Sequence, residues 1–480
     1  MSTTPTNGQP AEAGAGTASS SDYGKTASFL AIGVGLTGVI TYVYFFIASH
    51  VLSKPDYGQI TVLWSAVFIT ISTLYRPIEQ LLSRHIAEHT VKGEPISGTM
   101  RVASTIQLGL SLTFAVVALA LRGPIQNGLL EGNETLYWVF FAAVLFYAAS
   151  YFARGFLAGN KSFGLFTALI LSESCFRTIF AVLVAVSVLS GQSAVAIGVV
   201  AAPALSLVVV PFAFRRRARR HEQKPDMSSA SRQGMSGSAK GRGDDTSVSM
   251  AKGGGFAAAV LVIMFSEQAF LNAGPLVIRG LQGAAAAGFI FNVLMIARAP
   301  LQLFQAVSTS ILPHLTGLHT SEEPGSEDEF HRSVRMVLLG LIAFTALALA
   351  FMAAVGPTAM QIAFSKKFTY DREGLLLVTL GMGLYLASVT VNQACLAQGQ
   401  VRRAALRWIS CAVLFIGWNF VPLVSNEFRR VEVGFLLAAG VLFALLYYVY
   451  RRPHERAEDV PAPGSPEELE LQLAAIDENT

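Results

Sequence analysis

Long apolar stretches, separated by short polar ones, run through most of this chain. Each stretch has about 20 residues, the length that an α-helix needs to cross the hydrocarbon core of a bilayer. The pattern predicts an all-α polytopic membrane protein. Its twelve predicted spans lie near 26–48, 58–82, 100–121, 135–157, 163–188, 194–214, 254–278, 285–312, 334–356, 374–397, 404–424 and 431–450.

The composition excludes a soluble protein of this size. Hydrophobic residues make up 52% of the chain and charged residues only 14%, whereas soluble domains have about 25% charged residues. A Ser-, Gly- and Lys-rich segment that cannot bury a core divides the spans six and six. The predicted parts are a disordered N-terminus, 1–24; an N-lobe, 25–214; a basic linker, 215–252; a C-lobe, 253–450; and an acidic tail, 451–480.

Lys and Arg are concentrated in the loops on one side of the predicted spans, the side that carries both termini and the linker. Because cytoplasmic loops are enriched in basic residues, we expect both termini to be cytoplasmic. The arginine-rich run at 215–220 fits the same rule, and binding of anionic lipid headgroups is its alternative role. The net charge of +4 follows from this topology and does not indicate nucleic-acid binding.

The two halves of the chain resemble a diverged repeat. In the first half, Asp56-Tyr57-Gly58 precedes Arg76-Pro77, and in the second half, Ala287-Gly288 precedes Arg298-Ala299-Pro300. Transporters built from two parallel repeats bind their substrate between them. We therefore expect two six-helix lobes around a central cavity.

Four arginines, Arg76, Arg154, Arg177 and Arg298, lie inside the predicted spans. An arginine at the centre of a membrane helix costs roughly 2.5–3.5 kcal/mol on insertion scales, so such residues line a polar cavity or pair with other charges. The guanidinium group presents a planar set of donors that fits phosphate oxygens. We expect an anion site in which Arg177 and Arg298 face each other. Arg154 lies close enough to the interface to extend toward water instead.

Two amides extend the candidate site in the eighth span. Gln302 and Gln305 follow Arg298 at spacings that place all three on one helix face, beside the helix-weakening Pro300. We interpret this face as a substrate-binding cavity wall. The alternative is a polar contact between neighbouring helices.

Three carboxylates in the spans, Glu79, Glu173 and Glu267, are candidates for coupling or charge pairing. Glu173 and Arg177 are four residues apart and could neutralise each other, as could Glu79 and Arg76. Glu267 has no basic residue three or four positions away. It is therefore either a proton or cation site or the partner of an arginine on another helix.

No metal or cofactor is expected. The histidines lack metal-ligand spacing, and Cys175, Cys395 and Cys411 all fall within spans, which argues against disulfides and a cysteine-based metal site. No Gly-Lys-Ser/Thr nucleotide-binding loop occurs, so ATP is not expected to drive transport within this chain. H⁺ and Na⁺ are the candidate coupling ions.

Three stretches, Asp56–Ala87, Tyr151–Arg177 and Ala299–His314, resemble the polysaccharide-transporter (Wzx-like) branch of the multidrug/oligosaccharidyl-lipid/polysaccharide (MOP) flippase superfamily. The resemblance implies a MATE-like fold of two bundles around a cavity that opens alternately to either side. Members of the family move lipid-pyrophosphate-linked oligosaccharides or lipid-linked peptidoglycan precursor. A sister branch exports cationic drugs. The peptidoglycan-precursor flippases have fourteen spans, against the twelve predicted here.

We expect a transporter and not an enzyme: a flippase for a lipid-(pyro)phosphate-linked oligosaccharide in the bacterial cytoplasmic membrane. Its expected partners are this substrate, membrane lipids and glycan-assembly enzymes. A peptidoglycan-precursor flippase and a drug or cation antiporter are alternatives, although an antiporter needs a net acidic site. A glycan polymerase or ligase would need a sizeable outer loop, and the longest one predicted is 357–373. A scaffold for envelope synthesis is a further alternative.

Overall fold

The computed structural model describes residues 20–92, 95–209, 211, 245–298 and 326–452. Within them, the apolar stretches form helices. The first half contains α1 (Ser20–Val51), α2 (Lys54–Leu74), α3 (Arg76–Lys92), α4 (Ser97–Ala120), η1 (Pro124–Leu129), α5 (Glu134–Gly159), α6 (Phe163–Ala185), α7 (Gly191–Ser206) and η2 (Leu207–Val209). The second half contains α9 (Asp245–Gln282), the helix Ala284–Arg298, α11 (Ser326–Phe364), α12 (Arg372–Ala397), α13 (Val401–Trp418) and α14 (Glu427–Arg451).

Several helix starts are set by local sequence. The residue before the helix accepts a hydrogen bond from a backbone N–H in the first turn, which satisfies a donor that the helix leaves free. These caps are Ser53, Asn133, Asp371 and Asn426, for α2, α5, α12 and α14. All four belong to loops at the same end of the helices.

The predicted second span is two helices. α2 ends at Leu74 and α3 begins at Arg76, with Tyr75 between them. Pro77 is the second residue of α3, in the first turn, where a missing backbone N–H costs no hydrogen bond. The break places Arg76 inside the apolar segment Lys54–Ala87 and not at its end.

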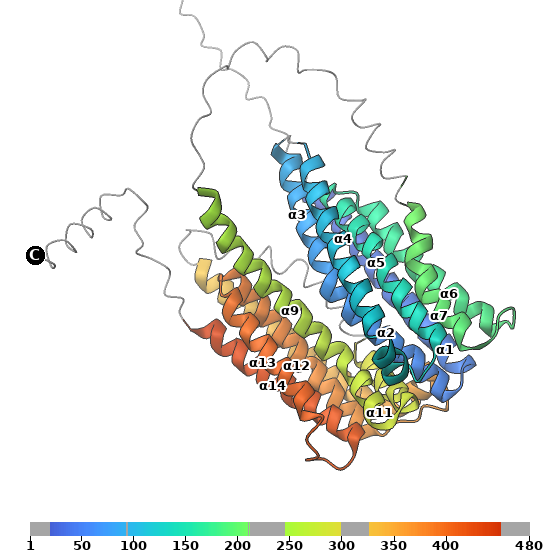
Figure 1. The fold of residues 1–480 in the computed structure, drawn as a ribbon. Coiled ribbons are helices and arrows are strands. Elements are labelled where there is room, and N and C mark those ends of the chain that lie inside the picture. The colour runs from blue at the N-terminus through green and yellow to red at the C-terminus, as the bar shows by residue number, and fades with distance from the viewer. Residues whose placement is uncertain (1–19, 93–94, 210, 212–244, 299–325, 453–480) are drawn as a thin grey trace, which may run out of the picture.

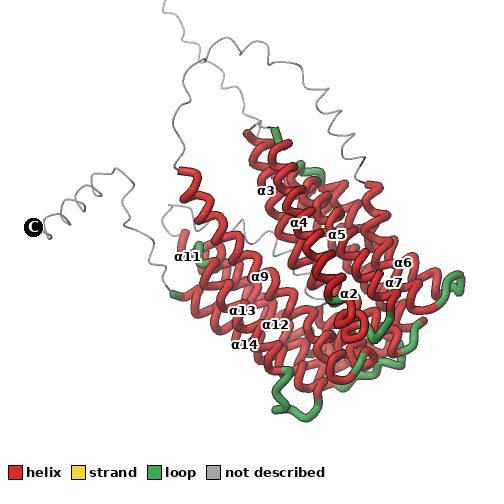
Figure 2. The backbone as a smooth tube through the Cα atoms, in the orientation of Figure 1, coloured by secondary structure: helices red, strands yellow, loops and turns green. Residues whose placement is uncertain are grey.

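The helices form two groups, α1 to α7 and α9 to α14 (Figure 1). The groups meet mainly where α2 packs against α9 and α1 packs against α11. From this contact the helices diverge toward the end where α3 finishes and α9 begins, as Figure 1 shows. Figure 2 shows helices and connecting loops throughout the part of the chain that the structure describes. The prediction of an all-α fold with two lobes is confirmed.

The predicted spans correspond to these helices. Nine helices among the described residues are long and apolar enough to cross a membrane, and Gly191–Ser206 and Ala284–Arg298 are shorter apolar helices. Large apolar side chains point outward from the bundle, with Leu108 of α4 70% exposed and Leu347 of α11 68% exposed. Such surfaces suit hydrocarbon and not water. The chain is a multi-pass membrane protein.

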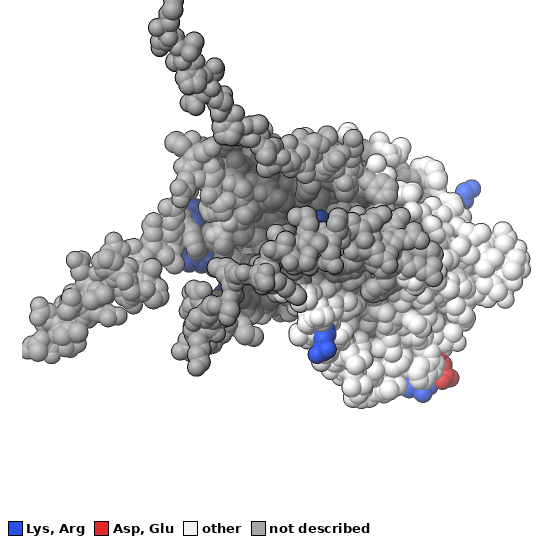
Figure 3. All heavy atoms as spheres, turned by 90° about the horizontal axis from the view of Figure 1, so that it is seen from above, with Lys and Arg blue, Asp and Glu red and all other residues white. Residues whose placement is uncertain are grey.

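The two ends of the bundle differ in charge. Figure 3 looks down on the end where α3 finishes and α9 begins, and the described charged side chains visible there are mostly Lys and Arg. The opposite end carries the acidic helix-start residues Glu134, Glu373 and Glu427 together with basic residues such as Lys366, Lys367 and Arg372, so charges of both signs are mixed there. The basic end is the one that the sequence predicts to be cytoplasmic.

Candidate functional site

The charged residues predicted in the spans lie in two places: inside the N-lobe and along the boundary between the lobes. Gln302 and Gln305 fall outside the described residues. The groove lined by α4 and α5, including Leu108, Ala149 and Phe152, contains none of the charged candidates. The candidate site is therefore defined by the charged side chains themselves.

Arg154 of α5 forms an ion pair with Glu173 of α6 inside the N-lobe. The side chains are 15% and 3% exposed. Ser150, one turn before Arg154, donates a second hydrogen bond to Glu173, and the Tyr151 ring lies 4.6 Å from the guanidinium carbon. A buried pair of this kind is strongly destabilised when one partner is removed, because the other charge is left uncompensated. Arg154 is thus held inside the lobe and does not extend to the interface.

Arg177 does not pair with Glu173, although the two are one turn apart on α6. Its guanidinium group donates to the Tyr147 hydroxyl over 3.1 Å and lies 4.5 Å from the centre of the Trp64 ring. Arg177 is 3% exposed and Trp64 is 6% exposed. In this conformation aromatic side chains of the N-lobe cover Arg177, and the predicted arrangement in which it faces Arg298 across a cavity stays a prediction.

Glu79 lies on α3, three residues after Arg76. The charges that act on it are, in order of strength, those of Arg154, Arg76 and Glu173. α3 and α5 approach closely at Gly155, where a Cβ atom would lie 2.8 Å from the Glu79 carbonyl oxygen. Glu79, which is half-buried, thus belongs to the same charge cluster as the Arg154–Glu173 pair, and the predicted Arg76–Glu79 interaction is one part of it.

Glu267 of α9 faces the other lobe. The charged group that acts on it is Arg76 of α3. Glu267 and Arg76 form none of the ion pairs between described residues, so both roles that the sequence left open remain open. Arg76 lies within electrostatic reach of both Glu79 and Glu267.

Arg298 ends the described part of the helix Ala284–Arg298 and is half-buried. The groups that act on it are two tyrosines, Tyr42 of α1 and Tyr385 of α12, and its Nε atom has no hydrogen-bond partner among the described residues. Tyr385 also lies within electrostatic reach of Glu267 and Arg76. Of the charged residues predicted in the spans, the described ones at this boundary are Arg76, Arg298 and Glu267, two guanidinium groups and one carboxylate.

The candidate residues predicted from the sequence include no tyrosine of this site. The hydroxyl of Tyr42 in α1 donates a hydrogen bond of 2.5 Å to the Met295 carbonyl oxygen in the other lobe. Tyr147 and Tyr151 share the face of α5 that carries Arg154, at spacings of seven and three residues, and this pattern could have identified them. Among the described residues, no cluster of three or more His, Cys, Asp or Glu side chains has metal-binding geometry.

No family model and no curated protein matches the chain. Solved structures do match it. An inward-facing multidrug resistance MATE family transporter of the MOP superfamily has a TM-score of 0.60 at 13% identity, over 88% of this chain and 97% of that chain. A variant of the Vibrio cholerae MATE transporter VcmN has a TM-score of 0.57 at 15% identity, over 89% and 97%. An outward-facing multidrug resistance MATE family transporter has a TM-score of 0.55 at 13% identity, over 89% and 95%.

These identities are low, so the likeness concerns the fold and not the substrate. The agreement extends over nearly the whole length of each chain and includes the division into two lobes. The chain has the fold of the MATE family transporters of the MOP superfamily.

Proposed function

We propose that the protein is a flippase that moves a lipid-(pyro)phosphate-linked oligosaccharide across a bacterial cytoplasmic membrane by alternating access. The observation that supports this most directly is Arg298, an intramembrane guanidinium group at the lobe boundary whose described neighbours are tyrosines and not carboxylates. Leaving a charge without a partner in a membrane is costly. A substrate that brings its own negative charge would remove this cost.

In this proposal Arg298 and Arg76 bind the phosphate groups. Each guanidinium group can donate two parallel hydrogen bonds to phosphate oxygens. The Tyr42 and Tyr385 hydroxyls lie within electrostatic reach of Arg298 and would hydrogen-bond sugar hydroxyls. Arg76 also acts electrostatically on Glu267. The phosphate groups of the substrate and the Glu267 carboxylate would therefore compete for the Arg76 guanidinium group.

In this proposal the cytoplasmic side is assigned from the charge of the two ends. With the basic end cytoplasmic, the lobes diverge toward the cytoplasm and are in contact on the outer side (Figure 1). The substrate would enter from the inner leaflet and leave after the contact on the outer side opens.

Coupling to H⁺ is assigned in this proposal to Glu79 or Glu267 and not to Glu173. Glu173 is held by Arg154 and Ser150, whereas neither Glu79 nor Glu267 takes part in the ion pairs between described residues. A carboxylate that is not fixed in an ion pair can change its protonation state without breaking one. Such a group can take up and release a proton during a transport cycle.

A cation or drug antiporter is the second candidate, because multidrug transporters are among the solved structures of this fold. The two functions require opposite charge at the lobe boundary. An antiporter would use Glu267 and Glu79 as ligands and would tolerate the loss of Arg298.

A lipid-linked peptidoglycan precursor presents the same pyrophosphate chemistry as the oligosaccharide and differs only in the sugar-peptide part.

The test is transport by the purified protein in liposomes. Fluorescent lipid-pyrophosphate oligosaccharide placed in one leaflet should reach the other leaflet, and a cationic dye should not be exported in a pH gradient. Export of the dye without lipid movement would reject the flippase in favour of the antiporter. Mass spectrometry of lipid-linked saccharides after depletion of the protein would identify the glycan.

A further inference from the structure

The lobes approach each other most closely at the end opposite the linker. Here α2 crosses the helix Ala284–Arg298, and a Cβ atom on Gly58 would lie 1.8 Å from the Ala284 carbonyl oxygen. A Cβ atom on Gly288 would lie 3.1 Å from the Tyr57 ring. These glycines belong to the motifs that matched in the two sequence repeats, so equivalent positions of the two lobes pack against each other.

Glu131, in the N-lobe loop between η1 and α5, reaches across this contact. Its Oε1 atom accepts a hydrogen bond of 3.0 Å from the backbone N–H of Ala284, the first residue of the helix Ala284–Arg298, called the C-lobe helix below. Its Oε2 atom accepts one of 2.8 Å from Gln59 of α2. A carboxylate at a helix N-terminus satisfies a free N–H group and interacts favourably with the helix dipole.

Lys367, in the C-lobe loop between α11 and α12, reaches in the opposite direction, from the C-lobe to a helix end of the N-lobe. Its Nζ atom donates a hydrogen bond of 3.2 Å to the carbonyl oxygen of Leu52, directly after the last residue of α1. A cation at a helix C-terminus is the favourable counterpart of an anion at an N-terminus. Each lobe therefore contributes one charged side chain to a helix end of the other.

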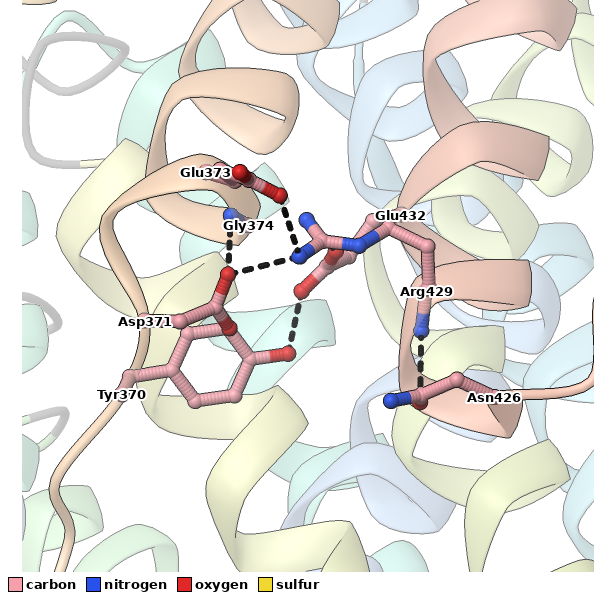
Figure 4. Close-up of polar contacts among 7 residues, drawn as sticks. All are labelled: Tyr370, Asp371, Glu373, Gly374, Asn426, Arg429 and Glu432. Carbon is pink, nitrogen blue, oxygen red and sulfur yellow. Dashed lines mark hydrogen bonds and ion pairs between the residues drawn. The ribbon is translucent and has the colours of Figure 1, made fainter.

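The loop that carries Lys367 is fixed to its own lobe by a group of polar contacts (Figure 4). Arg429 of α14 binds Asp371 at 2.7 Å, Glu432 at 2.9 Å and Glu373 at 3.2 Å. Tyr370 donates a hydrogen bond to Glu432. Burial raises the pKa of Asp371, but hydrogen bonds from Gly374 and Arg429 outweigh it and hold that pKa below its ordinary value. The loop thus moves with α12 and α14.

The other side of the same loop packs against the N-lobe. Phe368 lies 5.0 Å from Tyr57 of α2, between ring centres, and 4.9 Å from Phe289 of the C-lobe helix. Lys367 and Phe368 would therefore separate from Leu52 and Tyr57 when the lobes part at this end. Glu131 would separate from Ala284 in the same movement.

We propose that Glu131 and Lys367 form an electrostatic latch: reciprocal helix caps that hold the lobes together at the end opposite the linker and break when that end opens. The latch rests on the alternating-access part of the proposed function and is independent of the substrate. Opening exposes both helix ends to water, so the latch stabilises the closed state only. It also weakens with salt, because both charged side chains are exposed.

The test measures opening at this end directly. In a protein whose three native cysteines are replaced, Ser190→Cys and Ser425→Cys carry spin labels on exposed loops of the two lobes. Pulsed electron spin resonance then reports the fraction of molecules in which this end is open. Glu131→Gln and Lys367→Met should each raise the ratio of open to closed molecules about three- to fivefold, the size expected for one dipole contact. The double variant should raise it further.

Matched controls are available on the same loops. Glu134→Gln removes the acid three residues away, which pairs with Arg122 of the same lobe, and Lys366→Met removes the neighbouring exposed lysine. Both should leave the ratio unchanged. Equal ratios in the latch variants and these controls would overturn the proposal.

The readout separates this inference from the substrate. A shift of the open fraction without any movement of lipid-linked oligosaccharide would support the latch and reject the flippase. Normal lipid movement with no shift would do the opposite.

A disulfide between Glu131→Cys and Ala284→Cys should stop transport until it is reduced, and transport that continues through the cross-link would reject the latch.

Discussion

Arg154 and Glu173 form an ion pair between α5 and α6 in the interior of a membrane protein, with 15% and 3% of their side chains exposed. Their helices could each cross the bilayer alone by length and composition. The pair therefore determines how the two helices associate and not whether they insert.

The first prediction concerns this pair. Arg154→Met should destabilise the folded protein by about 3–5 kcal/mol, because the buried carboxylate loses its partner. Unfolding of the purified protein in detergent measures the change. Adding Glu173→Met should recover most of the stability, since an apolar pair leaves no uncompensated charge. A double variant as unstable as the single one would show that the ion pair is not the cause.

The second prediction concerns Arg298. Arg298→Ala should lower lipid flipping about tenfold or more, the effect expected for losing hydrogen bonds to a charged group, while the amount of protein in the membrane stays normal. Arg298→Lys should recover part of the activity, because it keeps the charge but loses the planar donors. The control is Arg101→Ala, which removes an exposed arginine of α4. Full activity of the alanine variant would remove Arg298 from the site.

The third prediction concerns Glu267 and Arg76, which lie within electrostatic reach of each other across the lobe boundary. Glu267→Arg should abolish transport by placing like charges together, and adding Arg76→Glu should restore part of it. Glu267→Gln should reduce transport and, if Glu267 exchanges protons, flatten its dependence on pH. Unchanged transport of the Gln variant at every pH would exclude Glu267 from the mechanism.

The fourth prediction concerns the glycine contact between the lobes. Gly58→Ala places a methyl group 1.8 Å from the Ala284 carbonyl oxygen, so α2 and the C-lobe helix must move apart. The open fraction at this end should rise well above that of the latch variants, as measured with the same spin labels. Gly35→Ala in α1 is the control, because a Cβ atom there meets nothing within 4 Å. Equal behaviour of the two variants would mean that the contact does not hold this end closed.

The fifth prediction concerns orientation. A thiol reagent that does not cross membranes should label Ser425→Cys from outside intact cells and should label Lys161→Cys only in inside-out vesicles. The reason is that basic loops remain cytoplasmic, and the two residues lie in loops at opposite ends of the bundle. The reverse pattern would invert the topology and the direction of transport.

The sequence alone determined the helices and their approximate bounds, because each span must satisfy its own backbone hydrogen bonds and present an apolar surface to lipid. It also identified the intramembrane charges, because charged side chains are rare in apolar spans owing to the free energy of placing them in a membrane. The repeat motifs around Gly58 and Gly288 could be found in the sequence because they are short, local patterns. None of these inferences requires knowing which helices are neighbours.

Only the tertiary structure decided how the charges pair. By sequence, Glu173 could pair with Arg177, one turn away on the same helix. In the structure α5 packs against α6, Glu173 pairs with Arg154, and Arg177 contacts Trp64 and Tyr147. An ion pair is set by the distance between charged atoms, and in a helix bundle the nearest partner can lie on a helix that is remote in sequence. The Arg76–Glu267 interaction and the Glu131 and Lys367 caps depend on lobe packing, which no local pattern encodes.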